Sequence, residues 1–310
     1  MKTTNNSVNA YFWAIFGLFL ASLGPSIFKE FLKESKINTE FGVALFLLLG
    51  GFSVAIVFAI EYFRHESANH VSLNLKVLVK LIFSGVFMAG QFFLFTISML
   101  VGSVTETAIM IQLSPLIACF LSALFLDEKI ENWKYFIYAG ILCVGGAFLI
   151  EDVSINSIRE TRLNFMIVGV LCAMAMAGKN VIQGSIKKYN RLPSIFIVSV
   201  TMILGAIFVL IFVDYGSFVM PNFKQFVVLV FLGIFTIAIP TWTNLYAYHI
   251  LGSMGKLSFF TYLFPIMCSI AAFFINQERG FDYNRLLISF MIISIGIYFA
   301  DLSIKKHKED

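Results

Sequence analysis

One basic residue, Lys179, lies well inside an apolar stretch of the sequence, about 16 residues from where that stretch begins. A charged side chain inside a bilayer is costly, so it usually faces a cavity or a partner helix. In a cavity, its ammonium group could bind a carboxylate or another anionic group of a ligand. Alternatively, the side chain extends along the helix to the nearer membrane interface. The sequence leaves both interpretations open.

Other polar and aromatic residues inside apolar stretches are candidates to line the same cavity. Asn180 directly follows Lys179, and Gln183 is four residues further on, so it shares the helix face of Lys179. The predicted substrate-binding residues are Gln91, Gln112, Lys179, Asn180, Gln183, Trp242, Asn244, Tyr248 and Tyr262. Each could instead stabilise contacts between helices, as polar side chains do in membrane proteins.

Two prolines, Pro115 and Pro265, interrupt apolar stretches at positions 150 residues apart. Proline has no amide hydrogen, so each one leaves the carbonyl four residues earlier, that of Ile111 or Thr261, without its helical donor. In lipid, such a carbonyl must be satisfied by protein or by cavity water. We therefore expect kinks there, with the next residue after each carbonyl facing the cavity. A kink that only packs against neighbouring helices is the alternative.

The acidic residues lie near the ends of the apolar stretches, and none occupies a centre. This placement weakens any prediction of a buried carboxylate that relays protons. Glu128 and Glu278 are predicted to stabilise the helix ends on which they lie.

Motifs of enzymes and of cofactor sites are missing from the sequence. The stretch from Gly252 to Lys256 resembles a phosphate-binding loop but is two residues too short. No metalloprotease or serine-hydrolase motif is present. The four cysteines lie inside apolar stretches without CxxC spacing, which is typical of small buried apolar side chains. We therefore predict no enzyme activity, no cofactor and no metal site.

The elements that must position the candidate residues are membrane-spanning helices. The 310-residue chain is 59% hydrophobic and 13% charged, whereas soluble domains are about 25% charged. Ten stretches meet or approach the roughly 20 apolar residues that a spanning helix needs. They are residues 11–32, 41–62, 77–99, 104–126, 133–150, 163–186, 194–213, 223–247, 254–276 and 285–303. No connection exceeds about 14 residues, which leaves no room for a nucleotide-binding domain.

The second half of the sequence repeats the first at an offset of 150 residues without a gap. The matched pairs are Gly102 and Gly252, Ser103 and Ser253, Leu113 and Leu263, Pro115 and Pro265, Glu128 and Glu278, and Gly146 and Gly296. Five spans per half is an odd number, so the second copy is inverted in the membrane, as in many secondary transporters. We predict an all-α integral membrane protein of two inverted five-helix repeats, residues 1–151 and 152–310. The hairpins at Gly102 and Gly252 would lie on opposite sides and are candidate gates.

This architecture, with a P-x(12)-E pattern closing span four and again span nine, resembles the EamA-type branch of the drug/metabolite transporter superfamily. The resemblance covers nearly the whole chain. Members move amino acids, other metabolites or drugs, commonly outward, without ATP hydrolysis, so the resemblance implies a secondary transporter. It further implies a cavity lined by spans one, three, four, six, eight and nine, with spans five and ten peripheral and available for a homodimer contact. The sequence departs from the W-G-x-x-F pattern of span one, since residues 23–28 contain no Trp.

The distribution of basic residues predicts the orientation. Of the 22 Lys and Arg residues, 13 fall on the side of the termini and eight on the other side, with Lys179 inside a span. Basic residues favour the cytoplasmic side, so both termini are expected there, in a bacterial inner membrane. The net charge of +4 includes no continuous basic face, which argues against nucleic-acid binding. The predicted function is alternating-access transport of small metabolites such as amino acids. The alternatives are a non-transporting membrane sensor or assembly protein and a lipid-modifying membrane enzyme.

Overall fold

The computed structural model describes residues 2–64, 73–150, 160–190, 192–217, 219–277 and 282–304. Ten helical spans cross the molecule, as the sequence predicts. The first five are α1 (Lys2–Glu34), α2 (Thr39–Arg64), α3 (Leu75–Val101), α4–η1–α5 (Val104–Met110, Ile111–Leu113, Ser114–Phe125) and α6 (Trp133–Phe148). The second five are α7 (Glu160–Asn190), α8 (Ser194–Leu210), α9–η4–α10 (Phe223–Phe231, Leu232–Ala238, Ile239–Leu251), α11–η5–α12 (Met254–Phe259, Phe260–Leu263, Phe264–Asn276) and α13 (Tyr283–Ser303). Within the described ranges no β-strand forms beyond an isolated bridge between Ile130 and Ile304.

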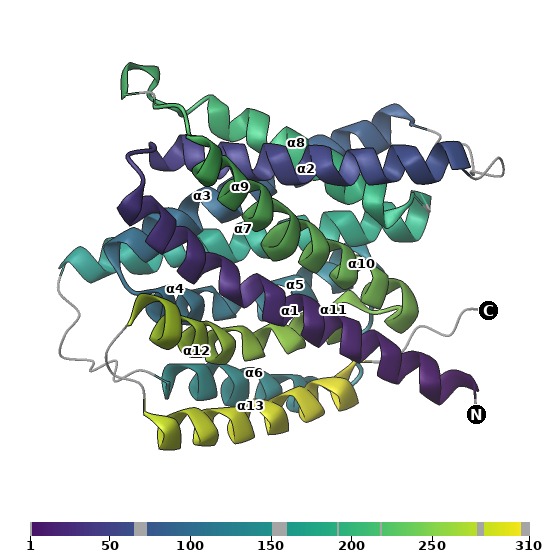
Figure 1. Ribbon diagram of the computed structural model, residues 1–310. Coiled ribbons are helices and arrows are strands. Elements are labelled where there is room, and N and C mark those ends of the chain that lie inside the picture. Colours follow the sequence, from purple (N-terminus) through teal and green to yellow (C-terminus); the bar gives the residue numbers. More distant parts are fainter. Residues whose placement is uncertain are drawn as a thin grey trace.

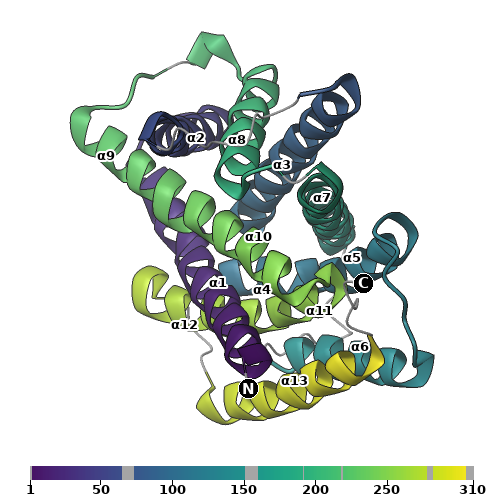
Figure 2. The same ribbon diagram turned by 90° about the vertical axis from the view of Figure 1, so that its right-hand side faces the viewer.

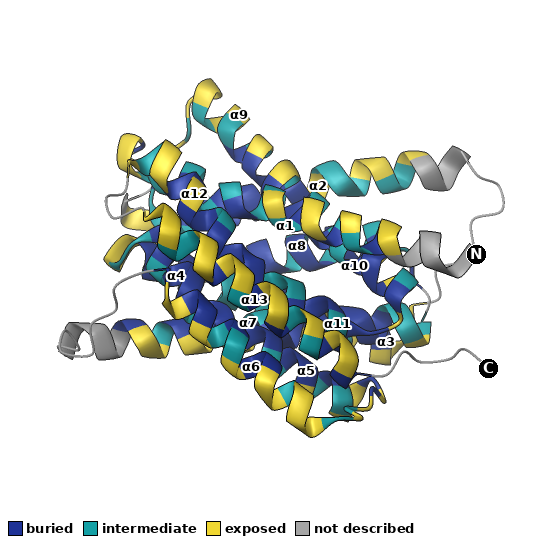
Figure 3. Cartoon of the chain, turned by 90° about the horizontal axis from the view of Figure 1, so that it is seen from below, coloured by how far each residue is buried: buried dark blue, intermediate teal, exposed yellow. Residues whose placement is uncertain are grey.

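The lengths and surfaces of these helices suit a bilayer. Eight of the described spans are long and apolar enough to cross a membrane, and α6 and α8 are shorter apolar helices. Side chains exposed along the outer helices are largely apolar, for example Ile141 (65%), Phe274 (74%) and Tyr298 (63%). Figure 3 shows such exposed positions along α6, α9 and α13. In water this surface would be unfavourable, whereas lipid tails solvate it.

The packing of the spans follows the repeat. Span three packs on span six (α3 on α7). Their equivalents in the other repeat, span eight and span one, also pack on each other (α10 on α1). Span one packs on span nine (α1 on α12), and span six on span four (α7 on α5). Span three meets span seven through α8, and span eight meets span two through η4. Exchanging each span for its equivalent in the other repeat therefore reproduces these contacts, so the two repeats pack on each other with approximate twofold symmetry.

Equivalent spans of the two repeats run in opposite directions. In spans four and nine, the first half of each helix packs on the second half of the other, α4 on α12 and α5 on α11, as Figure 1 shows. Two other equivalent pairs, α2 with α8 and α6 with α13, lie at opposite ends of the molecule (Figure 2). The start of α1 and the end of α13 lie on one face (Figure 1), which we call the terminal face.

Glycines allow the closest backbone contacts between the repeats. A Cβ atom on Gly50 of α2 would lie 2.6 Å from the carbonyl oxygen of Gly233 in η4. In the equivalent contact between spans three and seven, a Cβ atom on Gly205 would lie 3.3 Å from the carbonyl oxygen of Gly85. Small residues are typical of such interfaces in membranes, where lipid supplies no hydrophobic driving force and close packing stabilises helix pairs.

Candidate functional site: a cavity between the repeats

A cavity of about 140 Å³ lies between the two repeats. Spans one, three, four, six, eight and nine all contribute to its wall, and span two adds Phe46. Its lining residues are Ala14, Gly17, Leu18, Ala21, Gly24, Pro25, Phe28, Phe46, Gln91, Phe92, Phe95, Thr96, Met99, Ile111, Met176, Lys179, Asn180, Leu232, Thr236, Ile237, Pro240, Thr241, Asn244, Leu257, Phe260, Thr261 and Phe264. An engineered protein cavity of about 150 Å³ holds a benzene molecule, so this one suits a small ligand.

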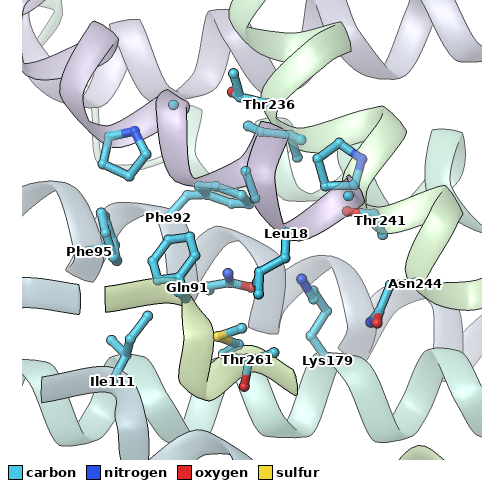
Figure 4. Close-up of a pocket in the computed structure, with 18 of the residues that line it drawn as sticks. Leu18, Gln91, Phe92, Phe95, Ile111, Lys179, Thr236, Thr241, Asn244 and Thr261 are labelled. Atoms are coloured by element: carbon cyan, nitrogen blue, oxygen red, sulfur yellow. The ribbon is translucent and has the colours of Figure 1, made fainter. Parts of the chain in front are cut away.

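Lys179 points into this cavity from α7 (Figure 4). The residue is only 6% exposed, and α7 continues to Asn190, about 16 Å beyond it at 1.5 Å per residue. The side chain therefore lies in the cavity wall, well before the end of its helix, which favours the cavity interpretation over extension toward the interface. Its Nζ atom forms no hydrogen bond or ion pair with any residue that the structure describes. The lining residues include no Asp or Glu, so the described wall leaves the ammonium charge unneutralised.

Other polar groups gather around Lys179. Asn180 of α7, Gln91 of α3, and Thr241 and Asn244 of α10 all line the cavity, and Figure 4 shows Asn244 near Lys179 at the same end. The Oε1 atom of Gln91 is buried without a hydrogen-bond partner. Three side-chain amides and one hydroxyl thus lie in the cavity wall with the cation.

The opposite end of the cavity is aromatic. Phe28, Phe46, Phe92, Phe95 and Phe264 line it. The ring centroid of Phe46 lies 4.9 Å from that of Phe28 and 5.7 Å from that of Phe92, in edge-to-face geometry. Phe92 and Phe95 lie away from Lys179 in Figure 4. The cavity is therefore amphipathic, with a cationic, hydrogen-bonding end and an apolar end.

The two prolines lie at breaks in spans four and nine, as predicted, but they leave no carbonyl unsatisfied there. A short 3₁₀ turn precedes each proline, and the amide of Ser114 donates to the carbonyl of Ile111. In the same way, the amide of Phe264 donates to the carbonyl of Thr261. The predicted free carbonyls are therefore wrong, because the tighter turn supplies a donor one residue earlier than an α-helix would.

The 3₁₀ turns also change which residues face the cavity. Ile111 and Thr261 line it, whereas Gln112 and Tyr262, which we predicted, are buried outside its wall. Gln112 donates from Nε2 to the carbonyl of Ala108 at 2.6 Å. Tyr262 packs against Phe259, and its hydroxyl has no hydrogen-bond partner.

Three more predicted residues lie outside the cavity wall. Gln183 and Tyr248 are buried one helical turn beyond Lys179 and Asn244, toward the terminal face. Tyr248 belongs there to a buried apolar cluster with residues such as Leu126 and Met254. Trp242 stacks with Tyr246 and contacts Trp13 between spans one and eight.

Some lining residues were not predicted. Thr96 and Thr236 reach the cavity while donating their hydroxyls to carbonyls one turn earlier in their own helices. Their donors are therefore already used, which makes them poor ligands. The phenylalanines of the apolar end could not be distinguished by sequence from lipid-facing ones, because both environments are apolar.

The two candidate gates differ in conformation. Gly252 ends α10 in a left-handed conformation with φ +67°, which favours glycine, and the amide of Gly252 donates to Tyr248. Gly102 ends α3 in an extended conformation, and Lys29 of span one donates to its carbonyl at 3.1 Å. Five spans separate the hairpins, so they lie on opposite faces, with Gly252 on the terminal face.

Glu128 stabilises a helix of the other repeat. Its carboxylate accepts from the backbone amides of Met254 (2.7 Å) and Gly255 (2.9 Å) and from the hydroxyl of Ser253 (3.0 Å), at the start of α11. A bond of 3.2 Å from Ser122 is its side-chain contact with the helix that precedes it. Glu128 therefore does contact the end of its own helix through Ser122, as predicted, but most of its side-chain hydrogen bonds go to the start of α11 in the other repeat. Glu278 lies outside the described residues.

Comparison with known proteins identifies the family. A model of the EamA-like transporter family matches residues 8–151 and again residues 164–300. The chain belongs to the EamA-like transporter family. The predicted family and the predicted fold of about ten helices in two repeats are thus confirmed. The protein is a multi-pass membrane protein of a family of small-molecule transporters, not of enzymes.

Solved structures support the same fold. One of 26 matching chains, described only as "Crystal structure of protein", aligns over 95% of this chain and 98% of its own length. Its TM-score is 0.70 at 17% sequence identity, which shows a shared fold and no more. No curated protein matches the chain.

Proposed function

We propose that this EamA-like protein carries a small metabolite, such as an amino acid or a related compound, across a bacterial inner membrane by alternating access. The observation that carries the proposal is the amphipathic cavity, which both repeats line and which holds a buried cation without a partner among the described residues. A buried charge of this kind is costly for a structural protein, but it suits a site that an anionic group occupies during part of a cycle.

The repeats offer a means of alternating access. In inverted-repeat transporters, exchanging the conformations of the two halves moves the opening from one face to the other around a fixed site. We propose that the buried cluster around Tyr248 closes the cavity toward the terminal face. We propose that this face is cytoplasmic, because it carries the greater number of basic residues. The contacts at Gly252 and Glu128 would then open when the cavity turns inward.

We also propose that residues 1–151 and 152–310 are the two moving units, and that transport needs no ATP. The exposed faces of α6 and α13 are the proposed homodimer contact, since these helices lie at one end of the molecule and contribute nothing to the cavity wall.

Flux measurements in proteoliposomes test the proposal. Purified protein is reconstituted into vesicles without nucleotide, and uptake of radiolabelled amino acids and organic acids is followed under an imposed solute or ion gradient. We expect uptake of at least one compound above the rate of protein-free vesicles. A strict requirement for added ATP, or uptake equal to that of empty vesicles for every compound, would contradict transport of this kind.

A further inference from the structure

The charge balance of the cavity points to the class of its ligand. Lys179 is the single charged side chain among the described lining residues, and no carboxylate accompanies it in the wall. We infer that the ligand is a small organic monoanion with an apolar body, whose carboxylate binds Lys179. This inference deepens the proposed function and rests on the same cavity.

A carboxylate fits the polar end better than a neutral or cationic group does. It would offset the buried ammonium charge, and charge-assisted hydrogen bonds between these groups are stronger than neutral ones. A carboxylate has about four acceptor positions. The amides of Asn180 and Asn244 and the hydroxyl of Thr241 line the same end and can donate to the positions that Lys179 leaves open.

The wall also discriminates between an organic acid and the matching α-amino acid. An α-ammonium group has three donors and a positive charge, and its usual partner in proteins is a carboxylate. The lining residues supply no such partner. The side-chain acceptors of the wall, such as the Oε1 atom of Gln91, which has no partner, are neutral oxygens without a negative charge. The charge of Lys179 would repel a second cation, so the acid without an amino group should bind more tightly than the zwitterion.

The apolar end fixes the rest of the ligand. Phe92 and Phe95 line the wall opposite Lys179 (Figure 4), and their rings offer apolar surface without a charged group. The cavity volume of about 140 Å³ matches a ligand body close in size to benzene. A carboxylate joined to a compact apolar group therefore satisfies both ends at once.

Four compounds that share a phenyl ring test this class by binding. The full-length protein in detergent is titrated with phenylacetate, its neutral amide 2-phenylacetamide, the zwitterion phenylglycine and the cation benzylamine, and the dissociation constants are measured calorimetrically. We expect phenylacetate to bind about ten- to hundredfold more tightly than the amide, as a charge-assisted bond predicts. Phenylglycine should bind less tightly than phenylacetate, and benzylamine should not bind measurably.

Two lysine substitutions on the same helix locate the effect. Lys179→Met should weaken phenylacetate binding to the level of the amide, while the unfolding temperature holds or rises because a buried charge is removed. Lys187→Met is the matched control. Lys187 lies on α7 outside the cavity and donates to the carbonyl of Leu192 at 3.3 Å, so its substitution should leave phenylacetate binding unchanged.

The inference is overturned if phenylacetate does not bind, if the amide or benzylamine binds as tightly, or if Lys179→Met retains wild-type affinity. Tighter binding of phenylglycine would keep the carboxylate contact but overturn the monoanion class. Binding is measured without flux, so the two proposals can fail separately. Binding that depends on Lys179, without flux in vesicles, would leave the ligand class standing and remove the transport proposal. Flux that does not depend on Lys179 would leave the transport proposal standing and remove the ligand class.

Discussion

Gly146 and Gly296, which lie 150 residues apart, pack on each other's helices in equivalent ways. A Cβ atom on Gly146 would lie 3.3 Å from the carbonyl oxygen of Ser289, and one on Gly296 would lie 3.2 Å from that of Ala139. Ala139 and Ser289 are themselves 150 residues apart. The contact between α6 and α13 therefore has approximate twofold symmetry, and the offset seen in the sequence is also the offset of the packing.

The first prediction concerns this contact. Gly296→Ala should destabilise the protein by about 1–3 kcal/mol, as overpacking in a close-packed interior does, because the new Cβ atom would meet Cys143. Gly145→Ala is the control, since no atom lies within 4 Å of a Cβ atom there. Thermal unfolding in detergent should show a lower midpoint for Gly296→Ala alone. Equal midpoints would mean that α6 and α13 do not pack as described.

The second prediction concerns Glu128. Glu128 is 7% exposed, and its carboxylate accepts from two backbone amides at the start of α11. In Glu128→Gln one acceptor oxygen becomes a donor and the charge is lost, so we expect a loss of about 2 kcal/mol of stability. Glu34→Gln, at an exposed position at the end of α1, should leave the unfolding midpoint unchanged. If both variants unfold alike, Glu128 is not a structural link between the repeats.

The third prediction separates Tyr262 from the site. Its hydroxyl is buried without a hydrogen-bond partner, and burial of an unpaired hydroxyl is unfavourable. Tyr262→Phe should therefore keep or raise the stability, by up to about 1 kcal/mol, with flux and ligand affinity unchanged. A large loss of flux at unchanged stability would return Tyr262 to the substrate-binding residues.

The fourth prediction tests the orientation. Lys36 and Lys129 are exposed in connections on opposite faces. In intact cells, an impermeant thiol reagent should label Lys36→Cys and not Lys129→Cys, because the face with Lys129 also carries the termini. The four native cysteines are buried and should give little background. Labelling of Lys129→Cys alone would reverse the proposed orientation, and equal labelling of both would contradict the topology.

Much of this fold was predictable because its signals are strong and local. Each span is an apolar stretch between polar residues, and Gly102, Pro115 and their counterparts set the repeat register. The end of span six was less predictable. The sequence suggested residue 186, but α7 continues through Lys187 and Lys188 to Asn190, since basic residues at a C-terminus favour a helix.

The site was predicted less completely, because apolar patterns cannot separate a lipid-facing side from a packed one. Trp242 was predicted to face the cavity and instead stacks with Tyr246, which is 37% exposed. The π-helix that precedes it, Leu232–Ala238, has a wider turn than an α-helix, so the residues after it face a different direction from the one that a 3.6-residue period predicts. The 3₁₀ turns similarly exchanged Gln112 for Ile111. Lys179 could be identified because a charge in a span is informative by itself.

The glycine contacts of Gly50 with Gly233 and of Gly85 with Gly205 have a kinetic consequence. Where side chains interdigitate, helices can shift only if several rotamers change together, which raises the activation barrier. Backbone surfaces that meet at glycine have no such side chains to rearrange. We therefore expect small translations between these helices to be fast, so that the rate of conversion between conformations is limited by the release of polar contacts, above all those of Glu128 with the start of α11.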